Sequence, residues 1–293
     1  MTGTAPAGLV VVDKASGMTS HDVVARMRRI AGTRKVGHAG TLDPMATGVL
    51  LLGVNRATRL LGHLMLTEKA YDAVVRLGVA TTTDDAEGET VDVTPATAVT
   101  DTAVREAFAR FVGDIEQVPS SVSAIKVDGK RAYARVRAGE AVELAARPVT
   151  VHGIEVGEIS REGDVVDVAV SVRCSSGTYI RALARDVGAA LGVGGHLTVL
   201  RRTAVGPFTL ADAHTLDELA EDLTLIPIAA VARRIFPAVD VDEAAAAAVK
   251  VGRRLTLDLG AEGRVALFDP QDEFLALYEQ RGADAVAVAV FTS

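Results

Sequence analysis

The residue with the clearest potential for chemistry is Asp43, which lies in the glycine-rich segment GHAGTLDPMATG at 37–48. An aspartate before a proline is common in turns, because proline favours an extended conformation in the residue before it and the carboxylate can bond nearby backbone. Asp43 alone is therefore compatible with a simple turn. However, a wholly apolar stretch follows at 49–54, and a loop held at the edge of a sheet is a usual place for a reactive carboxylate.

Two further side chains could work with such a carboxylate. Arg181 lies in GTYIRALARD at 177–186. A helical arginine is most often a surface charge, but at this place it can instead pair at two points with a carboxylate and hold it ionised. Tyr71, in KAYDA at 69–73, fits a core or half-buried position of a strand, and its ring could also stack on a nucleic-acid base.

Signatures of several other chemistries are absent from the sequence. It contains no GxxxxGK[ST] loop, no strand–GxGxxG–helix fingerprint and no GxSxG nucleophile elbow. The single cysteine, Cys174, excludes an internal disulfide and a cysteine-based zinc site, and the six histidines show no HxxxH or HxH spacing. We therefore expect no metal site. Cysteine usage favours the cytosol, and no apolar run is long enough for a transmembrane helix.

Charge is unevenly distributed along the chain. The 31 basic and 38 acidic residues give a net charge of −7, which globally disfavours a nucleic-acid partner. Two segments are nevertheless strongly basic, RMRRIAGTRK at 26–35 and KVDGKRAYARVR at 126–137. One such run is usually a solvated helix face, but two in an acidic chain favour phosphate contacts. The acidic residues gather elsewhere, notably in Asp84, Asp85, Glu87, Glu89 and Asp92.

Hydrophobic patterning predicts the elements that must position these residues. Strands are expected at 9–14, 49–54, 70–79, 165–172 and 196–206. Helices are expected at 21–31, 56–64, 102–112 and 177–192, the first capped by Thr19 or Ser20 and the third by Asp101. We expect a loop at 37–48 and a turn at Arg147-Pro148. Because the order lacks a regular βαβ alternation, we predict an α+β fold with a mainly antiparallel mixed sheet and flanking helices.

The end of the chain differs in character from the rest. After Ile235-Phe236-Pro237, which is typical of a linker, a helix is expected at 242–250 and short strands near 263–268, 273–278 and 285–291. We therefore predict two domains, a large one at 1–230 and a small β-rich one at 231–293.

Several motifs together resemble the bacterial tRNA pseudouridine-55 synthase family, which isomerises the uridine in the T loop of tRNA. The segment GHAGTLDPMATGVLLL at 37–52 resembles the family signature. The segment VVDKASGMTSHDVV at 11–24 resembles the family's N-terminal strand–loop–helix. The family's tyrosine-bearing strand and the following turn resemble KAYDAVVRLGVATTTDDAEG at 69–88. Further matches are VPSSVSAIKVDGKRAYARVRAGE (118–140), CSSGTYIRALARDVG (174–188) and LRRTAVGPF (200–208). The matches follow the family's order over about 9–210.

The resemblance implies a catalytic role for three residues. Asp43 would be the essential carboxylate near C1′ and C6 of the uridine, and whether it attacks C1′, attacks C6 or abstracts the 2′ proton stays open. Arg181 would keep it ionised. Tyr71 would stack on the uracil, and its hydroxyl is a candidate for moving the C5 proton, although an ordinary phenol would need help to act as a base. The isomerisation requires no cofactor.

The resemblance also implies how substrate is bound. The target uridine must be flipped out of a folded loop, and His38 would occupy or stack against the space that it leaves. Tyr179 and Leu200 would form walls of the pocket. The expected partner is the T-arm stem-loop of tRNA, bound by a monomer without a membrane or an obligatory protein partner.

Basic residues complete the expected binding surface. Lys14, Lys130 and Arg131 are expected to bind substrate, the last two from an RNA-clamping insertion at about 118–148. The small C-terminal domain loosely resembles the RNA-binding (PUA-like) domains that end such enzymes.

Two other functions stay open at this point. An RNA-binding or RNA-folding protein without activity is disfavoured by the presence of Asp43, Tyr71 and Arg181, although a tRNA-folding role can coexist with turnover. Pseudouridylation within a guide-RNA protein complex shares much of the motif set, but the bacterial-looking length and the absence of Lys-rich tails count against it.

Overall fold

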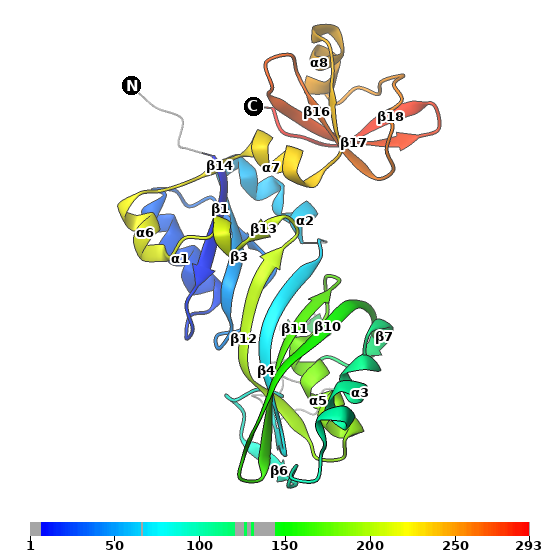
Figure 1. Cartoon of the computed structure of the whole chain (residues 1–293). Helices are drawn as coiled ribbons and strands as arrows, with labels where there is room; N and C mark the ends of the chain where they lie inside the picture. The colour runs from blue at the N-terminus through cyan, green and yellow to red at the C-terminus, as the bar shows by residue number, and fades with distance from the viewer. Residues whose placement is uncertain (1–6, 66, 121–125, 128–129, 132–143, 293) are drawn as a thin grey trace.

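The structure is a computed structural model of the whole chain. It describes residues 7–65, 67–120, 126–127, 130–131 and 144–292. One long sheet runs through most of the molecule, and a small C-terminal sheet lies at one end (Figure 1). Within the described residues, no helix is long and apolar enough to cross a membrane.

The large sheet has ten strands in the order β14-β1-β3-β12-β4-β11-β10-β7, with β2 beside β3 and β13 beside β12. The strands are β1 (Gly8–Lys14), β2 (Val36–Ala39), β3 (Thr47–Val54), β4 (Lys69–Leu77), β7 (Gly113–Gln117), β10 (Arg147–Glu162), β11 (Val165–Cys174), β12 (Gly195–Val205), β13 (Phe208–Thr209) and β14 (Ile226–Pro227). Among these pairs only β3–β12 is parallel. The predicted α+β fold with a mainly antiparallel sheet is therefore confirmed.

Short helices and two small pairs of strands accompany the large sheet. The helices are α1 (Ser20–Ile30), α2 (Leu61–Leu64), α3 (Asp101–Ala109), α5 (Ile180–Ala190), α6 (Leu216–Glu221) and α7 (Ile228–Ile235), with 3₁₀ turns η1 (Asn55–Arg59) and η2 (Leu210–Asp212). Two further antiparallel pairs are formed by β5 (Val79–Thr81) with β6 (Thr90–Val93), and by β8 (Lys126–Val127) with β9 (Lys130–Arg131). Helix α1 begins at a capping box, in which the Thr19 hydroxyl accepts from the Asp22 amide and the Asp22 carboxylate accepts from the Thr19 amide.

The C-terminal sheet shares a hydrophobic core with the large sheet. Its elements are β15 (Ala238–Asp240), α8 (Glu243–Lys250), β16 (Arg264–Phe268), β17 (Phe274–Arg281) and β18 (Asp284–Val290), with the strands in chain order. Phe268 and Phe291 belong to the same buried cluster as Leu51 and Phe208 of the large sheet. The small sheet is thus packed against the large one as well as joined to it by the chain.

Most predicted elements are present, but the polypeptide departs from the expectations in several places. Residues 37–39 of the expected loop belong to β2, because they pair with β3. The helix expected at 56–64 is a 3₁₀ turn followed by a single α-helical turn. Helix α3 is capped by Thr100 and not by Asp101, since the Thr100 hydroxyl accepts from the Ala103 amide.

The region that leads to α5 differs from the expected structure at two places. Arg147-Pro148 does not form a turn, because both residues begin the long strand β10 and pair with β7. This position suits proline, which is tolerated at the start of a strand. Helix α5 begins at Ile180, and the expected residues 177–179 precede it.

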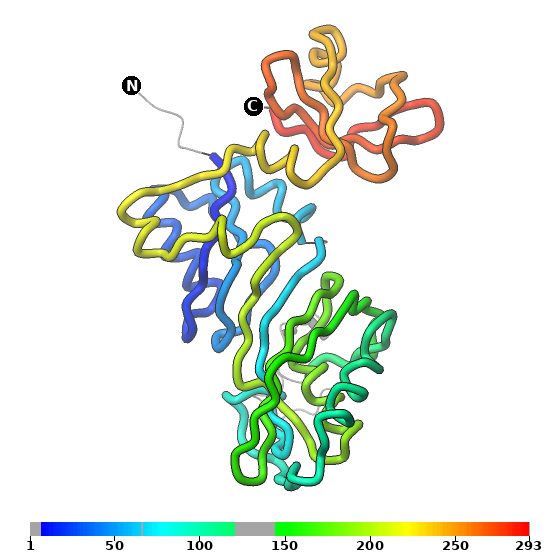
Figure 2. Tube along the Cα trace, viewed as in Figure 1, coloured from blue at the N-terminus to red at the C-terminus, as the bar shows by residue number. Residues whose placement is uncertain are grey.

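Strands β3 and β12 approach each other closely at Gly48. In Figure 2 the yellow-green β12 runs between the blue β3 and the cyan β4. Gly48 pairs with Arg202 and has a φ of 96°. A Cβ atom built at Gly48 would lie 2.2 Å from the Arg202 carbonyl oxygen. Only glycine fits here, directly after the loop that carries Asp43.

We predict that Gly48→Ala lowers the free energy of unfolding by at least about 2 kcal/mol, because strained backbone and a displaced neighbouring strand add together. The measurement is urea denaturation. Gly17→Ala is the matched control, since Gly17 has a φ of 82° but nothing within 4 Å of the added Cβ. It should cost only about 1 kcal/mol, and equal losses in the two variants would contradict the close-approach argument.

Candidate active site

A pocket of about 330 Å³ opens where the glycine-rich loop, β4, β12 and the start of α5 meet. It is lined by residues that include Asp43, Lys69, Tyr71, Tyr179, Arg181, Leu200 and Arg202. The fold therefore brings five of the predicted site residues, which are spread over almost 160 positions of sequence, to one cavity. Lys69 and Arg202 also line it, and neither was expected there.

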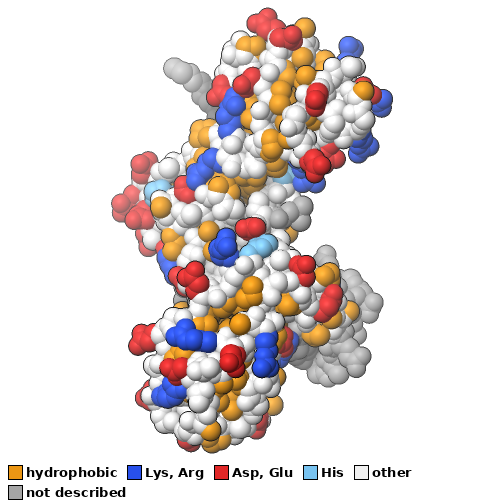
Figure 3. Space-filling view, turned by 45° about the vertical axis from the view of Figure 1, so that its right-hand side comes forward, with side chains coloured by type: hydrophobic (Ala, Val, Ile, Leu, Met, Phe, Trp, Pro, Cys, Tyr) orange, Lys and Arg blue, Asp and Glu red, His pale blue; other side chains and the backbone are white. Residues whose placement is uncertain are grey.

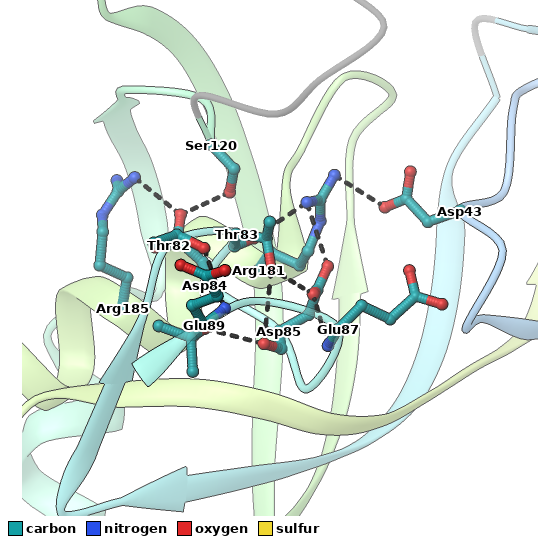
Figure 4. Close-up of polar contacts among 11 residues, drawn as sticks. Asp43, Thr82, Thr83, Asp84, Asp85, Glu87, Glu89, Ser120, Arg181 and Arg185 are labelled. Carbon is teal, nitrogen blue, oxygen red and sulfur yellow. Dashed lines mark hydrogen bonds and ion pairs between the residues drawn. The ribbon is translucent and has the colours of Figure 1, made fainter. Parts of the chain in front are cut away.

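Arg181, which lines this pocket, connects the pocket carboxylate of Asp43 to the buried carboxylate of Asp85 (Figure 4). Its Nη2 lies 2.9 Å from Oδ2 of Asp43, and its Nη1 lies 3.1 Å from Oδ2 of Asp85 and donates to the Thr83 carbonyl at 3.0 Å. Side-chain exposure is 8% for Arg181 and 4% for Asp85, but 38% for Asp43. The guanidinium thus bridges two carboxylates, and Asp43 stays accessible from the pocket.

Asp85 is itself held by its own turn, residues Thr82–Glu89, which we term the acidic turn. Its Oδ1 accepts hydrogen bonds from the Thr83 hydroxyl and from the Glu87 amide, while its Oδ2 faces Arg181. Both carboxylate oxygens are therefore used, and the side chain has a fixed direction. The sequence showed this turn only as a concentration of acid. The sequence does contain a matching pattern, because Asp84 and Asp85 are adjacent and Arg181 and Arg185 are four residues apart. In the structure these two aspartates pair with these two arginines.

The beginning of α5 is fixed by the buried side chain of Gln117. The Tyr179 amide donates to Oε1 of Gln117 at 2.9 Å, and Nε2 of Gln117 donates to the Tyr179 carbonyl at 3.1 Å. Tyr179 is the N-cap residue of α5 and has no side-chain cap of its own. Gln117 therefore supports the turn of helix that presents Arg181. Sequence reasoning missed it, because nothing in the local pattern marks a strand-end glutamine as a helix anchor.

Lys14 supports the Asp43 loop through hydrogen bonds to backbone carbonyls. Its ammonium donates to the carbonyls of Ala15, Met18 and Pro44 at 3.0, 2.7 and 3.1 Å, and the side chain is fully buried. Burial lowers the pKa of Lys14 to about 8, while the negative charge of Asp43 opposes that shift. The structure therefore does not place Lys14 where a substrate could reach it, contrary to expectation, because all three hydrogen bonds of its ammonium go to the protein backbone.

Arg202 is the second buried cation that holds this loop. Its Nε donates to the Val49 carbonyl at 2.7 Å and its Nη2 donates to the Gly40 carbonyl at 3.0 Å. Arg202 thus ties the beginning of the loop to the strand that follows it. Lys69 lies next to it on β4, with its ammonium on the carbonyls of Met65 and Thr67. Burial, and then the neighbouring Arg202, lower the pKa of Lys69 to about 8.

The aromatic and apolar residues form walls of the pocket. Tyr71 and Leu200 are buried, and Tyr179 is half-buried. Burial raises the pKa of Tyr71, and the nearby Arg202 opposes the shift. The phenol therefore stays protonated near neutral pH.

The remaining predicted residues lie outside this pocket or outside the described part of the molecule. His38 lies on β2, with its ring 5.7 Å from that of His21. Lys130 and Arg131 form β9, but their side chains, and the insertion residues 121–125, 128–129 and 132–143, are outside the described residues. In the basic run 26–35, Arg26 is paired with Asp217. The face drawn in Figure 3 carries basic and acidic side chains side by side.

The described residues contain no group of three or more His, Cys, Asp or Glu that could hold a metal ion. The site described above is instead built from carboxylates, buried cations and aromatic walls.

Comparison with protein families gives three consecutive matches. Residues 28–180 match "TruB family pseudouridylate synthase (N terminal domain)". Residues 181–228 match "tRNA pseudouridylate synthase B C-terminal domain", and residues 236–292 match "tRNA Pseudouridine synthase II, C terminal".

Similar proteins cover nearly the whole chain. The chain is 57% identical over 294 residues to tRNA pseudouridine synthase B of Arthrobacter sp. (strain FB24), covering 97% of this chain and 96% of that protein. It is 58% identical over 291 residues to the protein of that name from Rhodococcus jostii (strain RHA1), covering 99% and 95%. A chain of the solved Cbf5-Nop10-Gar1 complex is similar with a TM-score of 0.74 and 28% identity, covering 97% of this chain and 85% of that one.

We predict that Asp85→Asn lowers the free energy of unfolding by about 3 kcal/mol, because it leaves the buried Arg181 without one of its two negative partners. Urea denaturation measures the loss. The matched control is Asp217→Asn, whose carboxylate pairs with Arg26 but is 83% exposed. That change should cost less than about 1 kcal/mol. A loss at Asp85 as small as that at Asp217 would show that the buried pair does not stabilise the fold.

Proposed function

Because the chain belongs to the TruB family of pseudouridylate synthases, which are isomerases, we propose that it converts a uridine of tRNA to pseudouridine. We further propose that this uridine is the one at position 55 in the T loop. The observation that carries the proposal is the Asp43–Arg181 pair, a partly exposed carboxylate held by a buried guanidinium in a pocket with an aromatic wall.

The reaction needs what this pocket offers. The N1–C1′ bond breaks, the uracil turns, and a C5–C1′ bond forms. C5 then loses its proton and N1 gains one, so the product is an isomer and no electron acceptor is needed. Asp43 acts as the essential carboxylate, either on C1′, on C6 or on the 2′ proton, and each route requires it ionised. Arg181 holds that carboxylate in place through its contact at 2.9 Å. A preformed ion pair also avoids reorganisation during the reaction.

The walls of the pocket suit a flipped nucleotide. Tyr71 supplies a flat ring on which the uracil stacks, and Leu200 and Tyr179 enclose the base. His38, on the strand that precedes the Asp43 loop, occupies or stacks against the space that the uridine leaves in the T loop. Unstacking the base costs a few kcal/mol, and these contacts offset that cost.

The protein acts on tRNA by itself under this proposal. The solved structure named above is titled as a complex of Cbf5 with Nop10 and Gar1. It therefore represents the alternative function, in which the enzyme works within a multi-protein assembly. We propose instead a cytosolic monomer that needs no cofactor, binds the T-arm stem-loop directly and also assists tRNA folding. The domain division at about residue 230, with a PUA-like RNA-binding domain after it, is part of the same proposal.

We predict that the purified protein alone forms pseudouridine at position 55 of a bare tRNA transcript, as mapped by mass spectrometry. Asp43→Asn should abolish turnover and leave the tRNA Kd within about tenfold, because the amide keeps the shape of the carboxylate but not its reactivity. Activity that appears only with an added RNA or protein would favour the assembly. Turnover by Asp43→Asn within about tenfold of wild type would remove Asp43 from the chemistry.

The role of the insertion is tested by charge removal. We predict that Lys130→Ala, Arg131→Ala and Arg135→Ala combined raise the Kd for tRNA more than they lower the chemical step. For every phosphate that the variant no longer neutralises, the slope of log K against log[salt] should flatten by roughly 0.7–0.9, because fewer counterions are released on binding. Titrations at several salt concentrations measure both effects. Unchanged affinity with an unchanged slope would exclude these three residues from the RNA-binding surface.

A further inference from the structure

Asp84, the residue before Asp85, makes contacts that the proposed reaction does not use. Its Oδ2 accepts a hydrogen bond from the Ser120 hydroxyl at 2.6 Å and one from Nη1 of Arg185 at 3.2 Å (Figure 4). Its side chain is only 13% exposed. Asp84 is not among the described residues that line the pocket, so any influence on the reaction must pass through other side chains.

The partner of Asp84 lies one helical turn beyond the partner of Asp85. Arg181 and Arg185 are four residues apart on α5 and therefore project from the same face of the helix. Arg181 pairs with Asp85, and Arg185 pairs with Asp84. Two neighbouring ion pairs thus fasten the acidic turn to α5, and one of them contains the guanidinium that also contacts Asp43.

The backbone of Asp84 is held as firmly as its side chain. Its φ of 58° is in the left-handed region, which costs of order 1 kcal/mol for a residue other than glycine. Such a conformation persists only where its surroundings fix it. The Leu197 amide of β12 donates to the Asp84 carbonyl at 3.0 Å. Arg185 also donates to the Val118 carbonyl at 2.8 Å. Asp84 therefore joins α5, β12 and the segment after β7.

Building on the proposed function of Asp43, we propose that Asp84 is a positioning residue of the reaction. It docks the acidic turn on α5, so that Asp85 meets Arg181 and Arg181 in turn holds Asp43. Arg185 on α5 pairs with Asp84, and Asp84 is joined to Asp85 by one peptide bond. Asp85 pairs with Arg181, which in turn contacts the reacting carboxylate of Asp43. A displacement of about 1 Å at such a carboxylate is enough to cost up to a hundredfold in rate.

The experiment compares Asp84→Ala and Asp84→Asn with wild type. We measure the single-turnover rate at saturating tRNA and, separately, the tRNA Kd. Asp84→Ala should lower the rate at least about tenfold and change the Kd less than about threefold. Asp84→Asn keeps an acceptor for Ser120 and should restore part of the rate. A loss confined to affinity would overturn the proposal, because it would assign Asp84 to RNA binding alone, and so would an unchanged rate.

The matched control is Asp167→Asn. Asp167 on β11 pairs with Arg76 on β4 at 2.8 and 2.7 Å, and its side chain is 24% exposed. Like Asp84–Arg185 it is a partly buried ion pair, but it joins two strands of the large sheet and neither partner lines the pocket. Its loss should leave the rate within about twofold, since the ion pair of Asp167 is with Arg76 on the neighbouring strand and not with α5 or the acidic turn. An equal loss in Asp167→Asn and Asp84→Asn would mean that general destabilisation explains both, and would overturn the proposal.

A double-mutant comparison tests the route through Asp85. In an Asp85→Asn background the link to Arg181 is already weakened, so adding Asp84→Ala should lower the rate by less than about twofold more. Fully additive losses would show that Asp84 acts by another path, which contradicts the proposal.

A measurement without activity separates this inference from the proposed function. Amide hydrogen exchange across residues 81–89 should be at least about tenfold faster in Asp84→Ala than in wild type, and unchanged in Asp167→Asn. Unaltered protection would overturn the docking role even in an active enzyme. A wild-type protein that fails to modify tRNA would refute the proposed function, whereas faster exchange would still support the docking of the turn.

Discussion

The structure depends on one requirement, which is that the buried guanidinium of Arg181 must be matched by negative charge. An arginine with 8% exposure has lost most of its hydration, and an unpaired charge in that position would cost several kcal/mol. Asp43 and Asp85 meet the requirement from two segments that are far apart in sequence. Because both carboxylate oxygens of Asp85 are hydrogen-bonded to fixed partners, Asp85 sets the orientation of Arg181. Asp43 then remains the more exposed member of the group and the one that can reach a substrate.

A complementary arrangement keeps the Asp43 loop rigid. Lys14 and Arg202 are buried cations whose hydrogen bonds go to backbone carbonyls, and the carbonyls of Gly40, Pro44 and Val49 accept from them. Hydrogen bonds with a charged donor are stronger than neutral ones, and within a low-dielectric interior they hold the backbone tightly. Lys14 also brings positive charge near Asp43. The loop thus obtains its shape from two buried cations, of which Lys14 lies outside the pocket and Arg202 lines it.

Local patterning predicted the elements well but could not supply the contacts between them. Alternating valines located β11, and the resemblance located Asp43, Tyr71 and Arg181. Strand β10 was missed, because it is largely polar and exposed and begins with Arg147-Pro148. Asp85 lies 96 residues from Arg181 and Gln117 lies 62 residues from Tyr179, so no local pattern joins them. The sequence predicts that Lys14 binds substrate, together with other basic residues, whereas in the fold it is buried and donates to backbone carbonyls.

The far end of the pocket is supported by the small C-terminal sheet. Helix α2 leads directly to Met65 and Lys69, which line the pocket, and its Leu61 and Leu64 share one core with Phe268 and Phe291. Burial, and then the charge of Arg264, lower the pKa of His63, so the ring stays neutral near pH 7 and can accept a hydrogen bond from Arg264 at Nδ1. This arrangement fixes α2 through apolar packing and a polar contact at once. The position of the pocket wall at Lys69 therefore depends on residues more than 190 positions away, just as the position of Asp43 depends on the acidic turn.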